Sequence, residues 1–202
     1  MGKILPGVEC RIAADGEILT RGPHVMKCYF GKPNETAEAI DTDGWFHTGD
    51  IAEIDAEGFI TITDRKKDVL VTAGGKNIAP QNIENLLRAH PCVSQAMVHG
   101  DRIPYLTALI TLDEAEIRAF AAREKISAGP PEALAAHPRV RALVDEHVAA
   151  VNARLAPYET IKRFAILPRD FTEAAGEMTP TLKIRRREIT RTYRDLLDSL
   201  YK

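Results

Sequence analysis

The spacing of apolar residues predicts a β-rich region in the first third of the chain. Between positions 8 and 62, short apolar runs alternate with polar residues, as in half-buried β-strands. Two turns interrupt these runs, Ala14-Asp15-Gly16 and a four-residue hairpin loop, Asp55-Ala56-Glu57-Gly58, that ends in glycine. We therefore expect one short helix at 34–40 and strands at 8–13, 17–21, 51–54 and 59–62.

Beyond position 68 the pattern changes to helices that alternate with strands. Pro80 suits a helix first turn, and residues 83–87 place apolar side chains on one face after it. Asp113 and Glu116 have the spacing of a capping box, which predicts a helix running to about Lys125. Apolar stripes predict further helices at 140–155 and 189–200, and apolar runs predict strands at 93–98, 105–112 and 161–167.

These elements predict the α+β class, with a boundary between two domains. The second region has interleaved helices and no repeat, so we expect a short mixed or antiparallel sheet packed by helices. The boundary falls at five charged residues, Asp64-Arg65-Lys66-Lys67-Asp68, and the predicted domains are residues 1–65 and 66–202. Ionised side chains are costly to bury, so this run is predicted to be exposed connecting chain. It is either a solvated linker or a hinge.

Composition and charge are those of an ordinary globular protein. The 202 residues are 45% hydrophobic and 28% charged with a net charge of −2, so no overall field attracts nucleic acid. Cys10, Cys28 and Cys92 lack the spacing of a disulfide framework or a zinc site. This usage fits a reducing, cytoplasmic location and no metal ligands in the chain. No stretch approaches the ~20 apolar residues that span a bilayer, so we expect peripheral membrane contact at most.

Residues 45–50 carry the first candidate binding group. They end in Asp50, which follows a Thr-Gly turn and precedes a predicted strand. A carboxylate held at a strand end offers two acceptor oxygens, which suit capture of a vicinal diol such as a ribose. Capping of the turn by Asp50 is the alternative.

A second segment, residues 72–80, contains Gly74 and Gly75 directly before Lys76. Paired glycines let the backbone approach another chain or a ligand, because no Cβ obstructs it. The Gly-Gly-Lys-Asn spacing is not that of a phosphate-binding loop. Taken alone, the segment favours a tight turn before the helix at Pro80.

A third segment, residues 176–187, delivers Lys183 immediately before the basic start of a helix. Cations at a helix N-terminus oppose the helix dipole, so four of them there have a local cost unless an anion lies nearby. The segment is therefore either an anion site or a solvated basic turn that contacts RNA or a partner.

Taken in order, these segments resemble the successive motifs of the adenylate-forming (AMP-binding) superfamily of acyl-CoA synthetases, luciferases and peptide-synthetase adenylation domains. The resemblance runs along essentially the whole chain. The forms Gly-Gly-Lys-Asn-Ile-Ala-Pro and Thr-Pro-Thr-Leu-Lys are most similar to bacterial long-chain fatty acid–CoA ligases. The matching motifs are residues 44–50, 64–68, 74–77 and 180–183.

The resemblance implies a reaction in two steps. A fatty carboxylate attacks the α-phosphate of ATP, which Mg²⁺ accompanies, to give acyl-adenylate and pyrophosphate; the thiol of coenzyme A then displaces AMP. A lysine ammonium at the reacting phosphate would lower the barrier, because one anion attacks another. The implied roles are ribose binding by Asp50 and Arg65, a hinge at Lys67, a coenzyme A passage at Gly74, Gly75 and Lys76, and catalysis by Lys183.

The resemblance also implies what these residues lack. The family's phosphate loop, magnesium-binding glutamate and acyl pocket lie upstream of the matching motifs. Residues 1–65 are then the β-rich end of a large N-terminal domain, and residues 66–202 are its mobile C-terminal lid. The chain alone is expected to be inactive and to meet fatty acid, ATP and coenzyme A through the missing domain. The alternatives are an enzyme that loads a carrier protein and a stand-alone, non-enzymatic binding module that uses residues 183–187.

Overall fold

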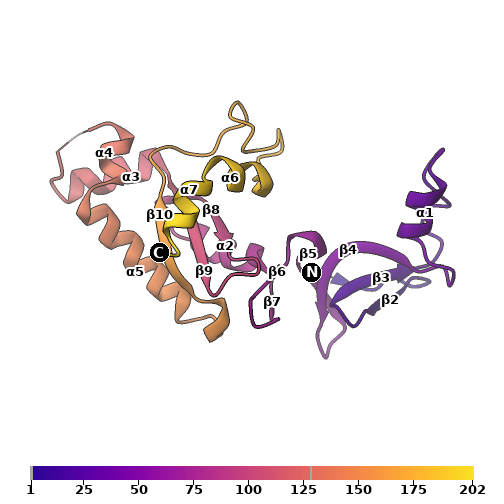
Figure 1. Ribbon diagram of the computed structural model, residues 1–202. Coiled ribbons are helices and arrows are strands. Elements are labelled where there is room, and N and C mark those ends of the chain that lie inside the picture. Colours follow the sequence, from indigo (N-terminus) through magenta and orange to yellow (C-terminus); the bar gives the residue numbers. More distant parts are fainter. Residues whose placement is uncertain (1, 128) are drawn as a thin grey trace. The chain divides into compact units, whose positions relative to one another are not determined.

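The chain folds as two units. The computed structural model describes residues 2–127 and 129–202 and divides the chain after Val69 (Figure 1). The second unit extends from Leu70 to Lys202. The division lies a few residues beyond Arg65, where the predicted first domain ends.

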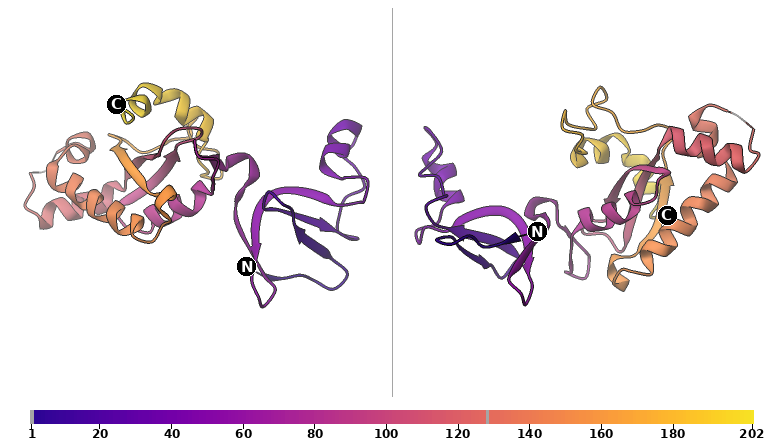
Figure 2. Two further views of the ribbon diagram at one scale, coloured as in Figure 1. Left: turned by 60° about the horizontal axis from the view of Figure 1, so that its bottom comes forward. Right: turned by 180° about the vertical axis from the view of Figure 1, so that it is seen from behind.

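The first unit is an antiparallel sheet with one short α-helix. Its elements are β1 (Gly2–Lys3), β2 (Glu9–Ile12), β3 (Glu17–Arg21), α1 (Pro33–Ala39), β4 (Phe46–Ile54), β5 (Phe59–Arg65) and the 3-10 turn η1 (Lys66–Asp68). The five strands have the order β1-β5-β4-β3-β2, and α1 stands beside one end of the sheet (Figure 2). The alternating pattern of the sequence forms these strands, and the sheet buries Ile18, Leu19 and Ala52.

Strand β4 is longer than the sequence predicted, and this changes the setting of Asp50. The predicted strand covered residues 51–54, whereas β4 begins at Phe46 because residues 46 and 47 pair with β3. Asp50 therefore lies inside a strand, and the expectation that it precedes a strand was wrong. The glycine before it, Gly49, is accommodated within the strand with φ of 71°.

The charged run 64–68 is only partly an exposed connector. Arg65 is the last residue of β5, and Asp64 before it is only 6% exposed. The Asp64 carboxylate accepts a hydrogen bond from the Arg65 amide at 2.6 Å. The expectation of exposed chain over the whole run is therefore corrected at Asp64, whose buried carboxylate has a protein donor, the adjacent Arg65 amide, in place of water.

The second unit is a mixed sheet covered by helices. Its strands are β6 (Leu70–Val71), β7 (Asn77–Ile78), β8 (Val93–His99), β9 (Leu106–Leu112) and β10 (Ile161–Ile166). Its helices are α2 (Pro80–Arg88), α3 (Glu114–Arg123), α4 (Pro131–Ala135), α5 (Pro138–Asn152), η2 (Pro157–Glu159), α6 (Arg186–Thr192) and α7 (Arg194–Ser199). The three-stranded sheet has the order β10-β9-β8, with β10 parallel and β8 antiparallel to β9. The predicted α+β class is confirmed.

Both faces of the three-stranded sheet are packed, and β9 shows how. Ala108 and Ile110 contribute to one apolar cluster together with residues of α2 and α5, whereas Leu109 between them contributes to another with α6 and α7. This alternation is the two-residue period of a strand. Figure 1 accordingly shows α5 and the pair α6–α7 on different sides of β9. The second cluster also holds Met178, which begins the segment that carries Lys183.

Two helical predictions needed correction. The single helix expected at 189–200 is divided into α6 and α7 at Tyr193, whose backbone leaves the helical region (φ −106°, ψ 24°). The short helix α4 was not expected, although Pro131 stands in its first turn. Within the described residues the longest helix, α5, has 15 residues, and no helix is both long and apolar enough to cross a bilayer.

Candidate functional site

A bulge in β4 presents Asp50. The register between β3 and β4 shifts so that residues 48–50 lie opposite Ile18 alone. Thr48 closes the bulge, since its hydroxyl donates to the Ile18 carbonyl at 2.7 Å and accepts from the Asp50 amide at 3.1 Å. Bulges of this kind redirect side chains, and here the Asp50 side chain keeps 23% of its surface exposed.

Arg65 lies directly across from Asp50 in the β4–β5 pair. Its Nε is 3.0 Å from Asp50 Oδ1, and its side chain is 58% exposed. Among the residues that the structure describes, no donor contacts Asp50 Oδ2, so this oxygen is available to a hydroxyl group of a ligand. The structure thus brings together the two residues that the sequence analysis assigned to nucleotide binding.

A buried glutamate that the sequence analysis missed joins this bulge to the charged run. Glu17 is 2% exposed, and its carboxylate accepts a hydrogen bond from the Gly49 amide at 2.8 Å. His47 Nδ1 (3.1 Å) and Lys66 Nζ (2.9 Å) are also within hydrogen-bond distance of this carboxylate. Lys66 Nζ also contacts Asp15 at 2.7 Å.

Hydrogen bonds decide the charge state of this network. Burial raises the pKa of Glu17, but the bonds from Lys66, His47 and Gly49 together outweigh it and hold the pKa below its ordinary 4.5. Bonds to Asp15 and Glu17 raise the pKa of Lys66. Glu17 was missed because these partners lie 30 to 49 positions away in sequence.

The predicted hinge residue, Lys67, directly follows the anchored Lys66. Lys67 is exposed within η1, and the division between the two units comes after Val69. The chain therefore passes from an anchored side chain to the unit boundary within a few residues.

The predicted coenzyme A residues lie on the turn between β6 and β7, residues 72–76, here called the Lys76 turn. The Thr72 amide donates to the Lys76 carbonyl (2.9 Å), and the Lys76 amide donates to the Thr72 hydroxyl (3.0 Å). Gly75 has φ of 73°, which favours glycine. Gly74 does not have a positive φ, and a Cβ built on it meets only Thr72 Oγ1 at 3.8 Å. The turn therefore explains Gly75 and leaves Gly74 unexplained.

Lys183 lies on a second exposed turn, residues 179–183, here called the Lys183 turn. Met178 and Ile184 pair antiparallel on either side of it. The Thr179 amide donates to the Lys183 carbonyl (2.8 Å), and the Lys183 amide donates to the Thr179 hydroxyl (3.1 Å). The Lys183 side chain is exposed, and no residue in 2–127 or 129–202 forms a hydrogen bond or ion pair with its amine.

Two of the three arginines after Lys183, Arg185 and Arg186, have partners within the second unit. Arg186, the first residue of α6, lies 2.8 Å from the buried carboxylate of Glu84 and donates to the Val98 carbonyl at 2.7 Å. Arg185 donates to the Gly176 carbonyl at 3.3 Å. The anion that the cationic helix start was expected to need is thus partly supplied by the protein's own Glu84.

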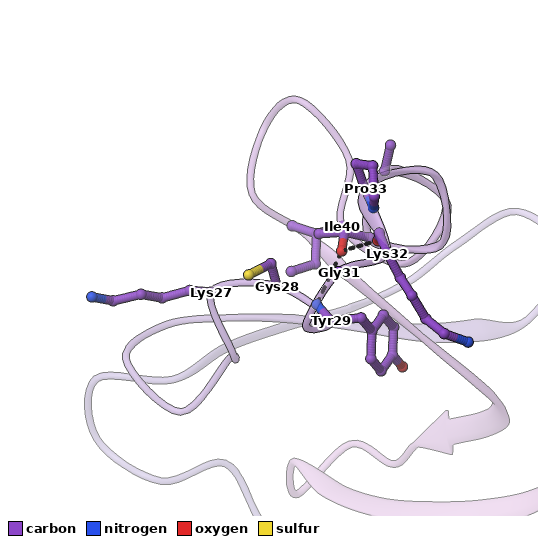
Figure 3. A pocket seen from close by; sticks show the side chains of 9 residues that line it. Lys27, Cys28, Tyr29, Gly31, Lys32, Pro33 and Ile40 are labelled. Atoms are coloured by element: carbon purple, nitrogen blue, oxygen red, sulfur yellow. Dashed lines mark hydrogen bonds between the residues drawn. The ribbon is translucent and has the colours of Figure 1, made fainter.

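Two further features of the described residues were considered, metal-binding clusters and the pocket beside α1. They contain no group of three or more His, Cys, Asp or Glu side chains placed to hold a metal ion. A surface pocket of about 500 Å³ beside α1 is lined by residues of the single segment 27–40 (Figure 3). It contains none of the predicted site residues, and we assign it no role.

Comparison with known proteins places these motifs in a family. A family model of the AMP-binding enzyme C-terminal domain matches residues 67–202. The chain therefore belongs to the AMP-binding enzymes, and its second unit is their C-terminal domain. The long-chain-fatty-acid–CoA ligase FadD15 of Mycobacterium tuberculosis is 45% identical over 202 residues, which are 100% of this chain and 34% of that protein.

Two solved structures have the same fold. The adenylation domain of a carboxylate reductase from Mycobacterium chelonae matches 96% of this chain and 30% of its own with a TM-score of 0.75, at 23% identity. O-succinylbenzoate coenzyme A synthetase of Bacillus subtilis, solved in complex with AMP, matches 92% of this chain and 34% of its own with a TM-score of 0.64, at 26% identity. The chain spans about a third of the length of the relatives that it matches.

Proposed function

We propose that this chain works as the C-terminal part of an ATP-dependent fatty acyl–CoA ligase, with Lys183 as its catalytic residue. The observation that carries the proposal is the exposed Lys183 amine, held on a hydrogen-bonded turn without a partner among the described residues. The 45% identity to a long-chain-fatty-acid–CoA ligase supports the substrate class. Residues 1–65 then complete a larger N-terminal domain, and residues 66–202 form its mobile lid.

In the first half-reaction a carboxylate oxygen attacks the α-phosphorus of ATP. A new P–O bond forms, the bond to the β-phosphate oxygen breaks, and pyrophosphate leaves with the electron pair. Negative charge gathers on the oxygens around phosphorus, and the Lys183 ammonium stabilises it there. Lysine suits this task because its charge is compact and its stem is long.

Asp50 and Arg65 hold the nucleotide in this scheme. Asp50 Oδ2 accepts a hydrogen bond from a ribose hydroxyl, while Arg65 fixes the other carboxylate oxygen. Mg²⁺ accompanies the ATP phosphates, and its protein ligands lie outside this chain.

In the second half-reaction the thiol of coenzyme A gives up its proton to solvent and its sulfur attacks the acyl carbonyl carbon. The C–O bond to the phosphate breaks, and AMP leaves with the electron pair. Lys183 must withdraw so that the thiol can enter. Rotation at Lys67 replaces the Lys183 turn by the Lys76 turn, whose glycines border the coenzyme A arm. Lys66 suits the fixed end of this movement, because Asp15 and Glu17 anchor it to the first unit.

The test separates the two half-reactions in the intact ligase. Lys183→Ala is expected to lower adenylate formation, followed as pyrophosphate release, by about 100- to 1000-fold, as loss of a preorganised electrostatic group does. Thioester formation from supplied acyl-adenylate should be unchanged. Lys162→Ala, which removes an exposed lysine of β10 in the same unit, is the matched control and should affect neither step.

Equal loss of both half-reactions in Lys183→Ala would reject the proposed role. The acceptor is tested in the second assay by offering coenzyme A and a phosphopantetheine carrier protein side by side. Faster transfer to the carrier would replace the coenzyme A ligase by a carrier-loading enzyme. Formation of adenylate by residues 1–202 alone would contradict the proposed need for a further domain.

A further inference from the structure

A fully buried carboxylate lies below the Lys183 turn. Glu177 is 0% exposed. Arg169 donates two hydrogen bonds to its carboxylate, from Nη1 to Oε2 (2.7 Å) and from Nη2 to Oε1 (2.8 Å). The Thr172 amide donates to Oε2 (3.1 Å), and the Tyr193 hydroxyl donates to Oε1 (3.1 Å). Each oxygen therefore has two donors, and the ionised form is satisfied.

The backbone of Glu177 holds the base of the Lys183 turn. Its carbonyl accepts the Arg185 amide at 2.7 Å. The next pair inward, Met178 and Ile184, is antiparallel, and both side chains belong to the apolar cluster under α6 and α7. Two backbone hydrogen bonds, from the Arg185 amide to the Glu177 carbonyl and from the Thr179 amide to the Lys183 carbonyl, flank the Met178–Ile184 pair and thus connect Lys183 to Glu177.

The same carboxylate joins two separate parts of the second unit. Arg169 and Thr172 lie in the loop after β10, and Tyr193 lies at the break between α6 and α7. Tyr193 also packs edge-on against Phe171, with ring centroids 6.2 Å apart. The loop after β10 and the break between α6 and α7 are therefore both fixed to the Glu177 carboxylate.

From this arrangement we propose that Glu177, held by Arg169, is a positioning residue for the Lys183 amine in adenylate formation. The inference rests on the function proposed for Lys183. An ion pair to a buried carboxylate adds little net stability compared with apolar packing, because the carboxylate loses its hydration, although the Arg169 side chain here stays 45% exposed. It does, however, impose one geometry, and a catalytic ammonium needs its geometry fixed to a fraction of an ångström.

The test uses Glu177→Gln in the intact ligase, because glutamine keeps the shape and removes the charge. We expect adenylate formation to fall by about 10- to 100-fold, as for a displacement of about 1 Å. Thioester formation from supplied acyl-adenylate should stay within about twofold, because Lys183 does not act in that step. The double variant Glu177→Gln/Lys183→Ala should be no slower than Lys183→Ala alone, because both changes remove the same interaction.

Glu84→Gln is the matched control. Glu84 is likewise buried in the second unit and paired with an arginine, at 2.8 Å from Arg186, and its carboxylate also accepts the Val98 amide of β8 at 2.8 Å. We expect any loss in this variant to fall on both half-reactions alike, through stability. If Glu177→Gln does not fold, Tyr193→Phe removes one donor to Glu177, keeps the ring, and should slow adenylate formation alone.

Equal loss of both half-reactions in the Glu177 variants, or unchanged adenylate formation, would overturn the inference. So would a further slowing in the double variant beyond Lys183→Ala. If Lys183→Ala itself spares adenylate formation, the proposed function fails; if only the Glu177 variants spare it, the positioning role alone fails.

Discussion

The Lys76 turn and the Lys183 turn share one backbone design. In each, a threonine amide donates to the carbonyl of the lysine four positions later, and that lysine's amide donates to the threonine hydroxyl. In each, the residue before the lysine donates to the threonine carbonyl at 2.9 Å and has a positive φ. The fold thus uses the same device twice to present a lysine on a fixed turn.

The two turns differ at the position that needs the positive φ. The Lys76 turn has Gly75 there, with φ of 73°, whereas the Lys183 turn has Leu182, with φ of 58° and 72% of its surface exposed. Leucine is strained in this conformation and glycine is not. Backbone geometry therefore does not explain the choice of Leu182 and Gly74 in these turns. Residues of this kind indicate a contact with a ligand or another domain.

Of the changes that compare the two turns, enlarging Gly74 is expected to have the largest effect. Gly74→Leu in the intact ligase should slow thioester formation from supplied acyl-adenylate on the order of 100-fold, because the side chain fills the path of the coenzyme A arm and displaces the thiol. Adenylate formation should be unchanged, since the Lys183 turn serves that step. The two half-reactions, measured separately, check this.

Gly74→Ala controls for damage to the turn itself. A Cβ at this position has its nearest neighbour at 3.8 Å, so Gly74→Ala should not lower the melting temperature. The loss of thioester formation should instead grow with side-chain size. Equal rates for glycine and leucine at position 74 would show that the Lys76 turn does not border coenzyme A.

Exchanging the two residues with positive φ tests the shared backbone design. Gly75→Leu should lower the free energy of unfolding by about 1–2 kcal/mol, the usual cost of a left-handed conformation. Leu182→Gly should change it by less than about 1 kcal/mol, because the strain relieved is offset by the greater freedom of glycine in the unfolded chain. Urea unfolding of the 202-residue chain measures both. A larger loss for Leu182→Gly than for Gly75→Leu would show that the Leu182 side chain stabilises the second unit.

Elements that follow from local periodicity were predictable. The stripe of α2, with Ile83 and Leu87 buried, and the alternation along β9 appear in the sequence as spacings of three or four and of two. The break between α6 and α7 was not predictable, because Tyr193 leaves the helix where its hydroxyl reaches Glu177, 16 positions earlier. Tertiary contacts override local propensity at such points.

The candidate site divides in the same way. Asp50, Arg65 and Lys183 were identified from motifs that are contiguous in sequence, and the structure pairs the first two and exposes the third. Glu17 and Glu177, which anchor them, were missed because an isolated glutamate normally predicts an exposed position. Only the fold brings their partners within hydrogen-bond distance.

The smallest expected effect concerns the titration of Glu177, whose carboxylate lies below the Lys183 turn. Burial raises the pKa of Glu177, but bonds from Arg169, Thr172 and Tyr193 together outweigh it and hold the pKa below the ordinary 4.5. A carboxyl group with a lowered folded pKa stabilises the fold above its unfolded pKa, and this contribution is lost as pH falls through the folded value. Below about pH 4.5 the base of the Lys183 turn should therefore loosen.

Hydrogen exchange at the Arg185 amide, which the Glu177 carbonyl accepts, reports this loosening. After correction for intrinsic exchange, its opening free energy should stay constant above about pH 4.5 and fall as the pH is lowered below that value. In Glu177→Gln the same amide should lose this pH dependence, because glutamine does not titrate. The Thr72 amide gives the comparison with the Lys76 turn, where Val71 is bonded to the exposed Asp101 instead. If the Arg185 amide responds to pH equally in the unchanged chain and in Glu177→Gln, the titrating group is not Glu177. The Lys183 turn would then have no support from a buried carboxylate that the Lys76 turn lacks.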